Sequence, residues 1–251
     1  IIEGSVGKDE IGGLIGHYNL MIQKIKKLIR AIIEKNEEQR MLELSKKQAE
    51  LNALVSQVNP HFMYNTLECI CMRSLIKGEK ETAGVVRDLS ALLRQMTRWR
   101  EDSITVGEEL RFVEMYLNIQ KYRYSDKLTY AIDITEDCRE AQIPKMAIIS
   151  FVENACVHGL EGVTGKGAIV ITVRRENKCI HAQIQDTGCG MTEELLENLR
   201  ERIQDANIEL LYDSRNTGVL NAYIRLRMYF GDRLDFNIES RKDYGTKVSI
   251  K

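Results

Sequence analysis

The sequence lacks the long apolar run that a membrane-spanning helix requires. No stretch of its 251 residues approaches the roughly 18 consecutive apolar residues that can cross a lipid bilayer. No signal peptide is visible, and the chain opens with Ile1-Ile2 where a complete protein would open with methionine. We therefore interpret the chain as part of a longer protein that continues upstream.

The sequence also lacks an excess of charge of either sign. Its 36 Lys and Arg residues nearly balance 37 Asp and Glu residues, for a formal net charge of −1. Nucleic-acid-binding domains commonly carry a strongly basic surface, so this balance gives no reason to expect a nucleic-acid partner. The apolar fraction of 43% is enough for a sizeable hydrophobic core.

Cysteine is present but lacks the spacing of a disulfide framework or a zinc site. The six cysteines include one C-x-C, Cys69 and Cys71, and no C-x-x-C pair with a histidine partner. We expect reduced thiols, most of them buried, as in cytoplasmic proteins.

Glycine and proline are both missing from residue 19 to residue 59, a run too long for an ordinary globular helix. Apolar residues overlap this run with the 4-3-4-3-4 spacing of a heptad seam. They are Leu14, Tyr18, Met21, Ile25, Leu28 and Ile32. The seam could belong to an amphipathic helix packed on its own domain, but it favours a parallel coiled coil with a second copy of the chain.

The patterns change from helical to strand-like near Ser125. Helical spacing leads up to Pro60 and returns over 79–100, with only Lys77-Gly78 as a break, which predicts an antiparallel hairpin. A further helix is expected over 107–124. Five later segments rich in Ile, Val, Thr and Tyr predict strands at 128–134, 168–175, 179–186, 234–240 and 246–250. Helical patterns between them lie at 145–158, 192–204 and 219–230. The predicted fold class is α+β, with a helical stalk and hairpin followed by an α/β sandwich.

A first motif, Asp186-Thr187-Gly188-Cys189-Gly190-Met191, follows a predicted strand and precedes a helix. Glycines two positions apart let the backbone turn tightly and approach a flat ligand. An aspartate at the strand end can accept a hydrogen bond from an exocyclic amine such as that of adenine. By itself the pattern fits a plain turn as well as a nucleotide site.

Two further motifs carry groups that suit a nucleotide. In the helix from Phe151 to Gly159, Asn154 and His158 share a face with Glu153 at its edge, and such oxygen ligands can hold Mg²⁺. The same residues could form a polar stripe that ends at a glycine. The third motif runs from Asn216 through Gly218 to Asn221 and opens a helix, whose N-terminal amides suit phosphate. Roughly two dozen residues between it and Gly190 could form a lid.

In this order the three motifs resemble the ATP-binding domain of the GHKL superfamily. The upstream string Gln57-Val58-Asn59-Pro60-His61-Phe62-Met63-Tyr64-Asn65-Thr66-Leu67 resembles the phosphoacceptor segment of LytS/YesM-type sensor histidine kinases. Residues 109–123, 227–231 and Gly245-Thr246 are also similar to that family. The opening Asp9-Glu10-Ile11-Gly12, with Tyr18-Asn19 and Met21, resembles the second half of a HAMP signalling module, so the resemblance covers nearly the whole chain.

The resemblance implies three parts: a partial HAMP-like helix and stalk over 1–33, dimerisation and phosphoacceptor helices over 34–124, and a GHKL-type ATP-binding domain over 125–251. It implies the cytoplasmic part of a bacterial membrane protein, reaching the membrane only through the upstream segment. As a homodimer, that protein would use ATP and Mg²⁺ to phosphorylate His61 and would then pass the phosphoryl group to an aspartate of a response-regulator protein. The expected catalytic residues are His61 and Asn65. The expected ATP-binding residues are Glu153, Asn154, His158, Asp186, Gly188, Gly190, Gly218, Asn221 and Thr246, with Asn154 as the metal ligand.

Among the four histidines, His61 is set apart by the proline before it. Pro60 leaves the Ser56 carbonyl without a helical partner and should bend the helix, which can turn the imidazole outward. With a reference pKa of about 6.5, a solvated imidazole is mostly neutral and able to act as a nucleophile. Asn65 lies one turn later on the same face and could hydrogen-bond the ring or the phosphoryl group.

Two departures from the family pattern keep alternatives open. Asn216 stands where the family has the first glycine of its Gly-x-Gly-Leu step, and Phe62 follows the acceptor where other classes of histidine kinase carry an acidic residue. The general base is therefore not identified. The alternatives are a GHKL ATPase that does not phosphorylate histidine and a degenerate relay that only binds nucleotide.

Overall fold

The computed structural model describes residues 17–30, 60–98, 103–160, 165–176, 179–206 and 218–251, with scattered positions between 35 and 46. The chain divides into two compact units, Ile1–Asn59 and Pro60–Lys251. Within the described residues, no helix combines the length and the apolar character that crossing a membrane demands.

In the first unit, residues 17–30 are helical, as the heptad spacing predicts. Four residues of the predicted seam, Tyr18, Met21, Ile25 and Leu28, are between 43% and 63% exposed in the single chain. A coiled-coil partner would cover such a row. Leu14, Ile32 and the HAMP-like opening at 9–12 lie outside the described residues, so the stalk and the HAMP likeness stay predictions.

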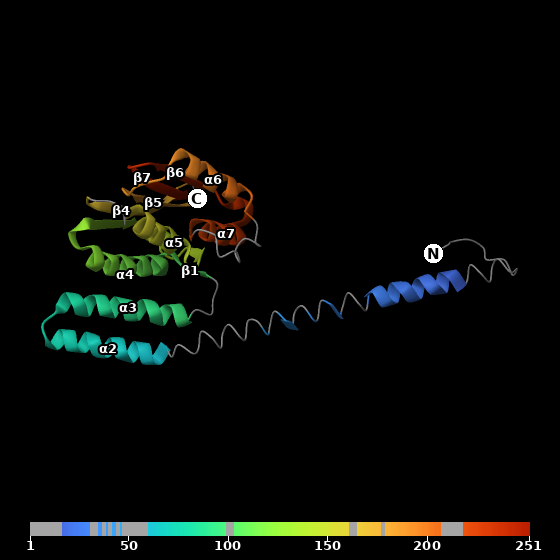
Figure 1. Ribbon diagram of the computed structural model, residues 1–251, viewed down its shortest axis with the longest axis horizontal. Helices are drawn as coiled ribbons and strands as arrows, with labels where there is room; N and C mark the ends of the chain where they lie inside the picture. The colour runs from blue at the N-terminus through green and yellow to red at the C-terminus, as the bar shows by residue number, and fades with distance from the viewer. Residues whose placement is uncertain are drawn as a thin grey trace. The chain divides into compact units, whose positions relative to one another are not determined.

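The second unit opens with the predicted antiparallel hairpin (Figure 1). Helix α2 (Pro60–Ile76) and helix α3 (Lys80–Arg98) are joined through Gly78, whose φ of +78° suits a residue without a side chain. The Tyr64 hydroxyl donates to the Leu93 carbonyl at 2.9 Å, and Arg94 pairs with Glu68 at 2.7 Å. The residues that precede Pro60, where a bend was predicted, are outside the described part.

Helix α4 (Val106–Tyr124) connects the hairpin with the sheet. It follows the short strand β1 (Ser103–Thr105), which pairs antiparallel with β3 (Gln142–Pro144). Thr105 and Glu108 form a capping box at its first turn, which satisfies amides that have no partner inside the helix. Val113 and Leu117 of α4 are fully buried in the core that α4 shares with the sheet.

The sheet has five strands in the order β2-β4-β5-β7-β6. Their bounds are β2 Leu128–Ile134, β4 Gly167–Glu176, β5 Cys179–Asp186, β6 Phe236–Arg241 and β7 Gly245–Ile250. Strand β2 runs parallel to β4, and the other neighbours are antiparallel. Ile169, Ile171 and Val173 are fully buried while Val170 between them is exposed, so only one face of the sheet carries the core.

The helices of the second half cover that buried face (Figure 1). They are α5 (Ala147–Asn154), α6 (Glu193–Gln204) and α7 (Gly218–Phe230), and α5 continues as a π-helix over Ala155–Leu160. This arrangement of a mixed sheet under helices confirms the predicted α+β class.

Candidate active site

Asp186 ends strand β5 and is only 5% exposed. Its Oδ1 accepts the backbone N–H of Gly188 at 2.8 Å and of Thr246 at 3.3 Å. Burial raises the pKa of this carboxyl, and the two amides oppose that shift. Among the described residues, no group donates to Oδ2, and Asp186 lines a cavity. One carboxylate oxygen is therefore used to hold the turn, and the other is available to a ligand.

The turn after Asp186 depends on its two glycines. A side chain at Gly188 would come within 2.2 Å of the Gly159 carbonyl oxygen, so this turn and the end of the π-helix can approach only without one. Gly190 has a φ of +60°, and a side chain there would collide with the Arg241 carbonyl at 2.0 Å. The D-x-G-x-G pattern is thus a requirement of close backbone packing.

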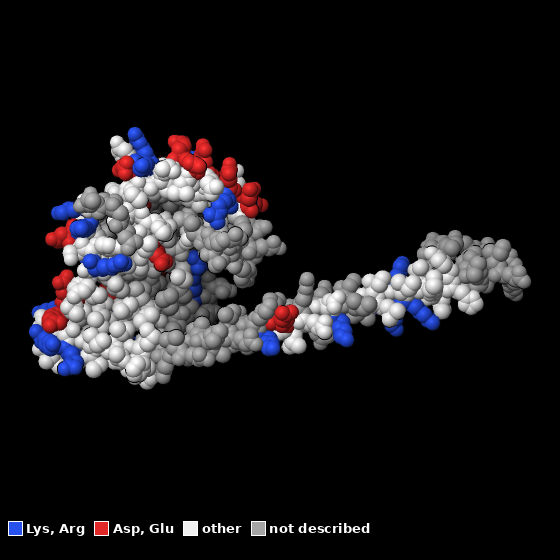
Figure 2. All heavy atoms as spheres, in the orientation of Figure 1, with Lys and Arg blue, Asp and Glu red and all other residues white. Residues whose placement is uncertain are grey.

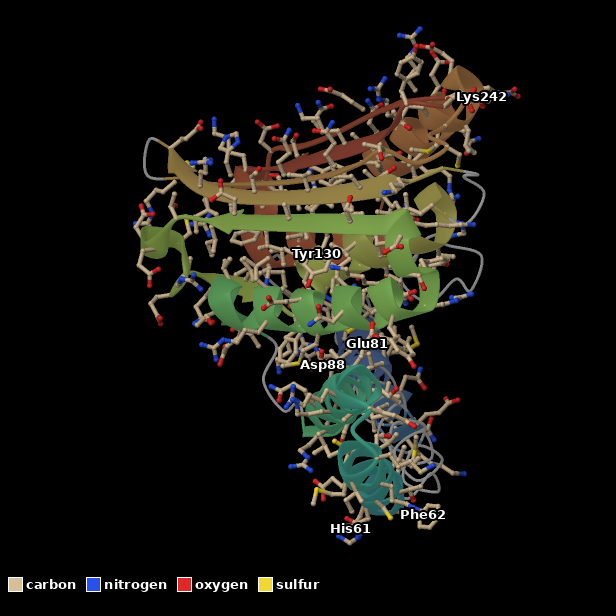
Figure 3. All side chains as sticks on the ribbon, turned by 90° about the vertical axis from the view of Figure 1, so that its left-hand side faces the viewer. His61, Phe62, Glu81, Asp88, Tyr130 and Lys242 are labelled. Atoms are coloured by element: carbon tan, nitrogen blue, oxygen red, sulfur yellow. The ribbon has the colours of Figure 1, made fainter. Side chains whose placement is uncertain are left out.

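The β6–β7 hairpin braces the turn from its other side. The Met191 N–H donates to the Ser240 hydroxyl at 2.9 Å, and the Asp243 N–H donates to the Cys189 carbonyl at 2.7 Å. The tip of this hairpin, marked by Lys242 in Figure 3, lies far from His61 at the opposite end of the unit. The hydrogen bonds of Met191 and Asp243 fix the position of the turn that follows Asp186.

The π-helix brings Cys156, His158 and Gly159 of the second motif next to the turn that follows Asp186. The Cys189 N–H donates to the Gly159 carbonyl at 2.8 Å, and the Cys189 thiol donates to the His158 carbonyl at 3.0 Å. A π-helix is uncommon and is often found at functional sites. Cys156 lies within the π-helix. Burial, with smaller contributions from Asp186 and Glu153, raises the pKa of its thiol to about 12, so this cysteine stays protonated and unreactive.

A cavity of about 320 Å³ lies between the turn, the end of α5 and helix α6. Five of the nine predicted ATP-binding residues line it: Asn154, His158, Asp186, Gly190 and Thr246. The other four, Glu153, Gly188, Gly218 and Asn221, are not part of its lining in the described residues. Gly188 nevertheless shapes the turn, and Gly218 is the first residue of α7, directly before the cavity residue Val219.

The predicted phosphoacceptor His61 is exposed on α2. The Asn65 amide nitrogen lies 3.3 Å from Nδ1 and 3.4 Å from Nε2 of the His61 ring. An amide at nearly equal distances from both ring nitrogens cannot lie along the lone pair of each. In a neutral ring only one nitrogen holds a lone pair, and the Asn65 N–H can donate to that nitrogen alone. Attack by this nitrogen therefore requires the contact to open, or the amide to turn its Oδ1 toward the ring N–H.

Known protein families match two regions of the chain, one that contains His61 and one that contains the cavity. A histidine kinase family model matches residues 49–128, and a model of the histidine kinase-, DNA gyrase B-, and HSP90-like ATPases matches residues 140–251. The first contains His61, and the second contains the cavity. The chain belongs to the histidine kinase family.

Three curated relatives are similar over most of this chain. Sensor histidine kinase YesM of Bacillus subtilis is 31% identical over 97% of the chain and 39% of its own length. Sensor histidine kinase YpdA of Escherichia coli is 30% identical over 90% of the chain and 38% of its own length. Sensor protein kinase HptS of Staphylococcus aureus is 26% identical over 93% and 44%, respectively. The chain thus spans about two fifths of the length of these kinases.

Helix α6 supplies a part of the cavity wall that the sequence motifs do not predict. Leu195, Asn198, Leu199 and Arg202 line the cavity at the i, i+3, i+4 and i+7 positions of α6. Acidic side chains gather on the outside of this helix (Figure 2), at Glu193, Glu194, Glu197 and Glu201. The sequence pattern that could have revealed these residues is their helical spacing, which places the polar Asn198 and Arg202 on the same face of α6 as two leucines. Residues 207–217, the rest of the predicted lid, lie outside the described part.

The kinase hairpin meets the sheet-bearing part through α3 and α4, and His61 is on its far side. The Asn118 amide on α4 donates to Asp88 on α3 at 3.1 Å, and the Tyr130 hydroxyl of β2 donates to Asn118 at 2.5 Å. Figure 3 shows Asp88 and Tyr130 on opposite sides of α4, with His61 directed away from the nucleotide domain.

Proposed function

We propose that this chain is the phosphoacceptor and ATP-binding part of a sensor histidine kinase that transfers the γ-phosphoryl group of ATP to His61. The observation that carries the proposal is the pairing of an exposed His61, held by Asn65, with a cavity whose wall offers the available Oδ2 of Asp186. Chain similarity to YesM, YpdA and HptS supports the same function.

In this proposal Asp186 identifies the base of the nucleotide. Its Oδ2 accepts the exocyclic amine of adenine, which a guanine base does not present at that position. Gly190 and Thr246 line the cavity next to it, and Gly188 holds the turn in place. The first turn of α7, from Gly218 towards Asn221, offers amide N–H groups to the phosphates. The Asn221 Oδ1 is buried with no partner among the described residues, so it can accept a hydrogen bond from a ligand or an ordered water.

The cavity also fits Mg²⁺ bound together with the phosphates. Asn154 lines it with an amide that has no hydrogen-bond partner in the described residues, and amide oxygen is a ligand that Mg²⁺ accepts. No cluster of three or more His, Cys, Asp or Glu side chains able to hold a metal exists in that part of the chain. This suits Mg²⁺, which keeps several waters and usually takes one or two protein ligands plus phosphate oxygens. When bound, the ion neutralises charge on the phosphates.

The transfer step needs a neutral His61 ring. The lone pair of one ring nitrogen forms a bond to the γ-phosphorus, the bond from that phosphorus to the β,γ-bridging oxygen breaks, and ADP leaves with the electron pair. The product is a phosphoramidate, and the other ring nitrogen keeps the ring proton. Asn65 orients the ring when its side-chain amide is turned so that Oδ1 accepts the N–H of the nitrogen that does not attack. Positioning of this kind supplies much of the rate in phosphoryl transfer.

We further propose that the phosphoryl group passes from His61 to an aspartate of a response-regulator protein. The complete protein would be a bacterial membrane sensor, anchored through the segment upstream of this chain. The experiment that tests the proposed function is incubation with γ-labelled ATP, followed by acid and base treatment. Label that is lost in acid and kept in base supports the proposal. ATP turnover without label would identify an ATPase, and nucleotide binding without either would identify a relay.

Dimerisation through α2 is part of this proposal. Phe62, Cys69, Met72 and Ile76 are exposed residues of α2 at a spacing of seven, three and four positions, and Phe62 and Ile76 are 68% and 82% exposed. A stripe of this kind at heptad-like spacing is stabilised when a second copy covers it. His61 lies beside this stripe, so a partner hairpin would be close to the acceptor.

We expect Met72→Lys to weaken the dimer by about tenfold or more, because a charge would be desolvated between the apolar faces. Light scattering over a concentration series measures the change. Met228→Lys on α7 is the matched control, since Met228 is 56% exposed and Met72 is 59% exposed. A dimer of unchanged strength in Met72→Lys would mean that this face of α2 is not the interface.

Asp186→Asn is expected to weaken ATP binding by about tenfold or more, the equivalent of one charge-assisted hydrogen bond of about 1.5–3 kcal/mol. Asparagine can still accept the Gly188 and Thr246 amides, but it places an N–H group opposite the adenine amine. Titration with a fluorescent ATP analogue provides the measurement. Asp235→Asn, at an exposed position outside the cavity, serves as the control. Unchanged affinity in Asp186→Asn would contradict the adenine role.

A further inference from the structure

A carboxylate outside the cavity is bonded to the helix that carries Asn154. Glu109 on α4 is 0% exposed. Its Oε2 accepts the backbone N–H of Met146 at 3.1 Å, and its Oε1 accepts those of Ile148 and Ile149 at 3.0 and 3.2 Å. These amides form the N-terminus of α5, so a side chain almost forty residues earlier acts as the cap of this helix.

Helix α5 needs this external cap because its own N-terminus offers none. The first amides of a helix have no partner within it, and a negative charge near them is favourable. The N-cap residue Met146 has a left-handed backbone, with φ of 59°, and its side chain makes no capping hydrogen bond. Glu109 supplies both the acceptors and the charge that the sequence around Met146 lacks.

Arg225 of α7 completes the cluster around the α5 N-terminus. Its Nη2 donates to the Ser150 hydroxyl at 2.9 Å and to the Met146 carbonyl at 3.2 Å, while the Ser150 hydroxyl donates to Met146 O at 2.6 Å. Burial raises the pKa of Glu109 and lowers that of Arg225, and each charge opposes the shift of the other. Three helices are therefore tied together at one buried point.

Asn154 is the last residue of α5, and the helix is only eight residues long. At 1.5 Å per residue, the capped end lies about 10 Å from Asn154. A short helix moves as a rigid piece, so a shift at the Glu109 end displaces Asn154 by a similar amount. The residues proposed to contact adenine, Asp186 and Thr246, lie instead on β5 and β7, and Glu109 does not contact these strands.

We propose that Glu109 is a positioning residue for phosphoryl transfer, which holds α5 so that Asn154 meets the Mg²⁺ of the bound nucleotide. The proposal rests on the proposed function, in which Asn154 is the metal ligand. Under this proposal α4 links the hairpin to the nucleotide cavity. The helix contacts α3 of the hairpin through Asn118 and Tyr122, and through Glu109 it holds the helix that lines the nucleotide cavity.

The experiment compares nucleotide binding with and without Mg²⁺ in Glu109→Gln. Glutamine has one acceptor oxygen and an N–H group that cannot accept from a backbone amide, so the α5 cap is incomplete. We expect affinity for a fluorescent ATP analogue in EDTA to stay within about twofold of the unchanged protein. The Mg²⁺ concentration for half-maximal tightening should rise by about tenfold or more.

Glu108→Gln is the matched control. Glu108 is the neighbouring carboxylate and also bonds a backbone amide, that of Thr105, but it caps α4 and does not contact α5. It should lower the melting temperature without changing the Mg²⁺ response. If Glu109→Gln likewise lowers only the melting temperature, or weakens binding equally with and without Mg²⁺, Glu109 is structural and the proposal is wrong.

Should Glu109→Gln fail to fold, Ser150→Ala tests the same cluster more gently, because it removes one link between Arg225 and Met146. The expected change is a smaller rise in the Mg²⁺ requirement, with faster amide hydrogen exchange confined to residues 147–154. An unchanged Mg²⁺ requirement would overturn the proposal. Asn154→Ala distinguishes a failure of the metal role of Asn154 from a failure of the positioning role of Glu109. If it leaves the Mg²⁺ response intact, the metal role itself fails; if it removes the response while Glu109→Gln keeps it, only the positioning role fails.

Discussion

Replacing His61 with glutamine is expected to reduce the acid-labile label from γ-labelled ATP to background. Glutamine has nearly the reach of histidine but no nucleophilic ring nitrogen, so no phosphoramidate can form. His61 is exposed on α2, and the substitution should not disturb the fold or the distant nucleotide cavity. Binding of a fluorescent ATP analogue should therefore remain within about twofold of the unchanged protein.

The control for this variant is His181→Gln. His181 lies on strand β5, outside the described lining of the cavity, and its loss should leave the label unchanged. His158 is less suitable, since it lines the cavity. Label that persists in His61→Gln at the level of the unchanged protein would show that another residue accepts the phosphoryl group.

Asn154→Ala is expected to lower the rate of phosphoryl transfer by at least about a hundredfold. Charge neutralisation by the metal is worth several kcal/mol in reactions of this type, and each 1.36 kcal/mol is a factor of ten in rate. Single-turnover labelling at saturating ATP measures the rate apart from nucleotide affinity. Binding of ATP in EDTA should change little, because Asp186 and Thr246 are not on α5.

Asn237→Ala provides the comparison, because the Asn237 amide is exposed on β6 and bonds only to Glu239 among the described residues. In the Asn237→Ala variant, His61 should be labelled at the same rate as in the unchanged protein. A similar rate in Asn154→Ala would mean that the metal is held by other groups, and the positioning role of Glu109 would fail with it.

Local signals predicted most of the fold. The strand segments match β2, β4, β5, β6 and β7 within about two residues, because alternating apolar positions report a half-buried sheet directly. The hairpin followed from two helical patterns with Lys77-Gly78 between them. The three-residue strands β1 and β3 were missed, since a strand that short has no periodicity to detect.

The cavity was predicted only in part. Asp186, Gly190, Asn154, His158 and Thr246 belong to motifs that are recognisable in one dimension, and all five line it. The α6 residues carry no motif, and their place in the site depends on how α6 packs beside β6. Roles in nucleotide and metal binding stay predictions for all of them.

The sequence alone determined the family and most of the helices and strands, and it predicted His61 as the phosphoacceptor. These properties are written in contiguous strings, such as the eleven residues from Gln57 to Leu67, and in periodic apolar patterns. Only the tertiary structure decided which distant groups meet: Asp186 with Thr246, Gly188 with Gly159, and Glu109 with the start of α5. The physical reason is that a buried carboxylate takes whichever donors the packing brings within about 3 Å, and no local pattern encodes a partner forty residues away.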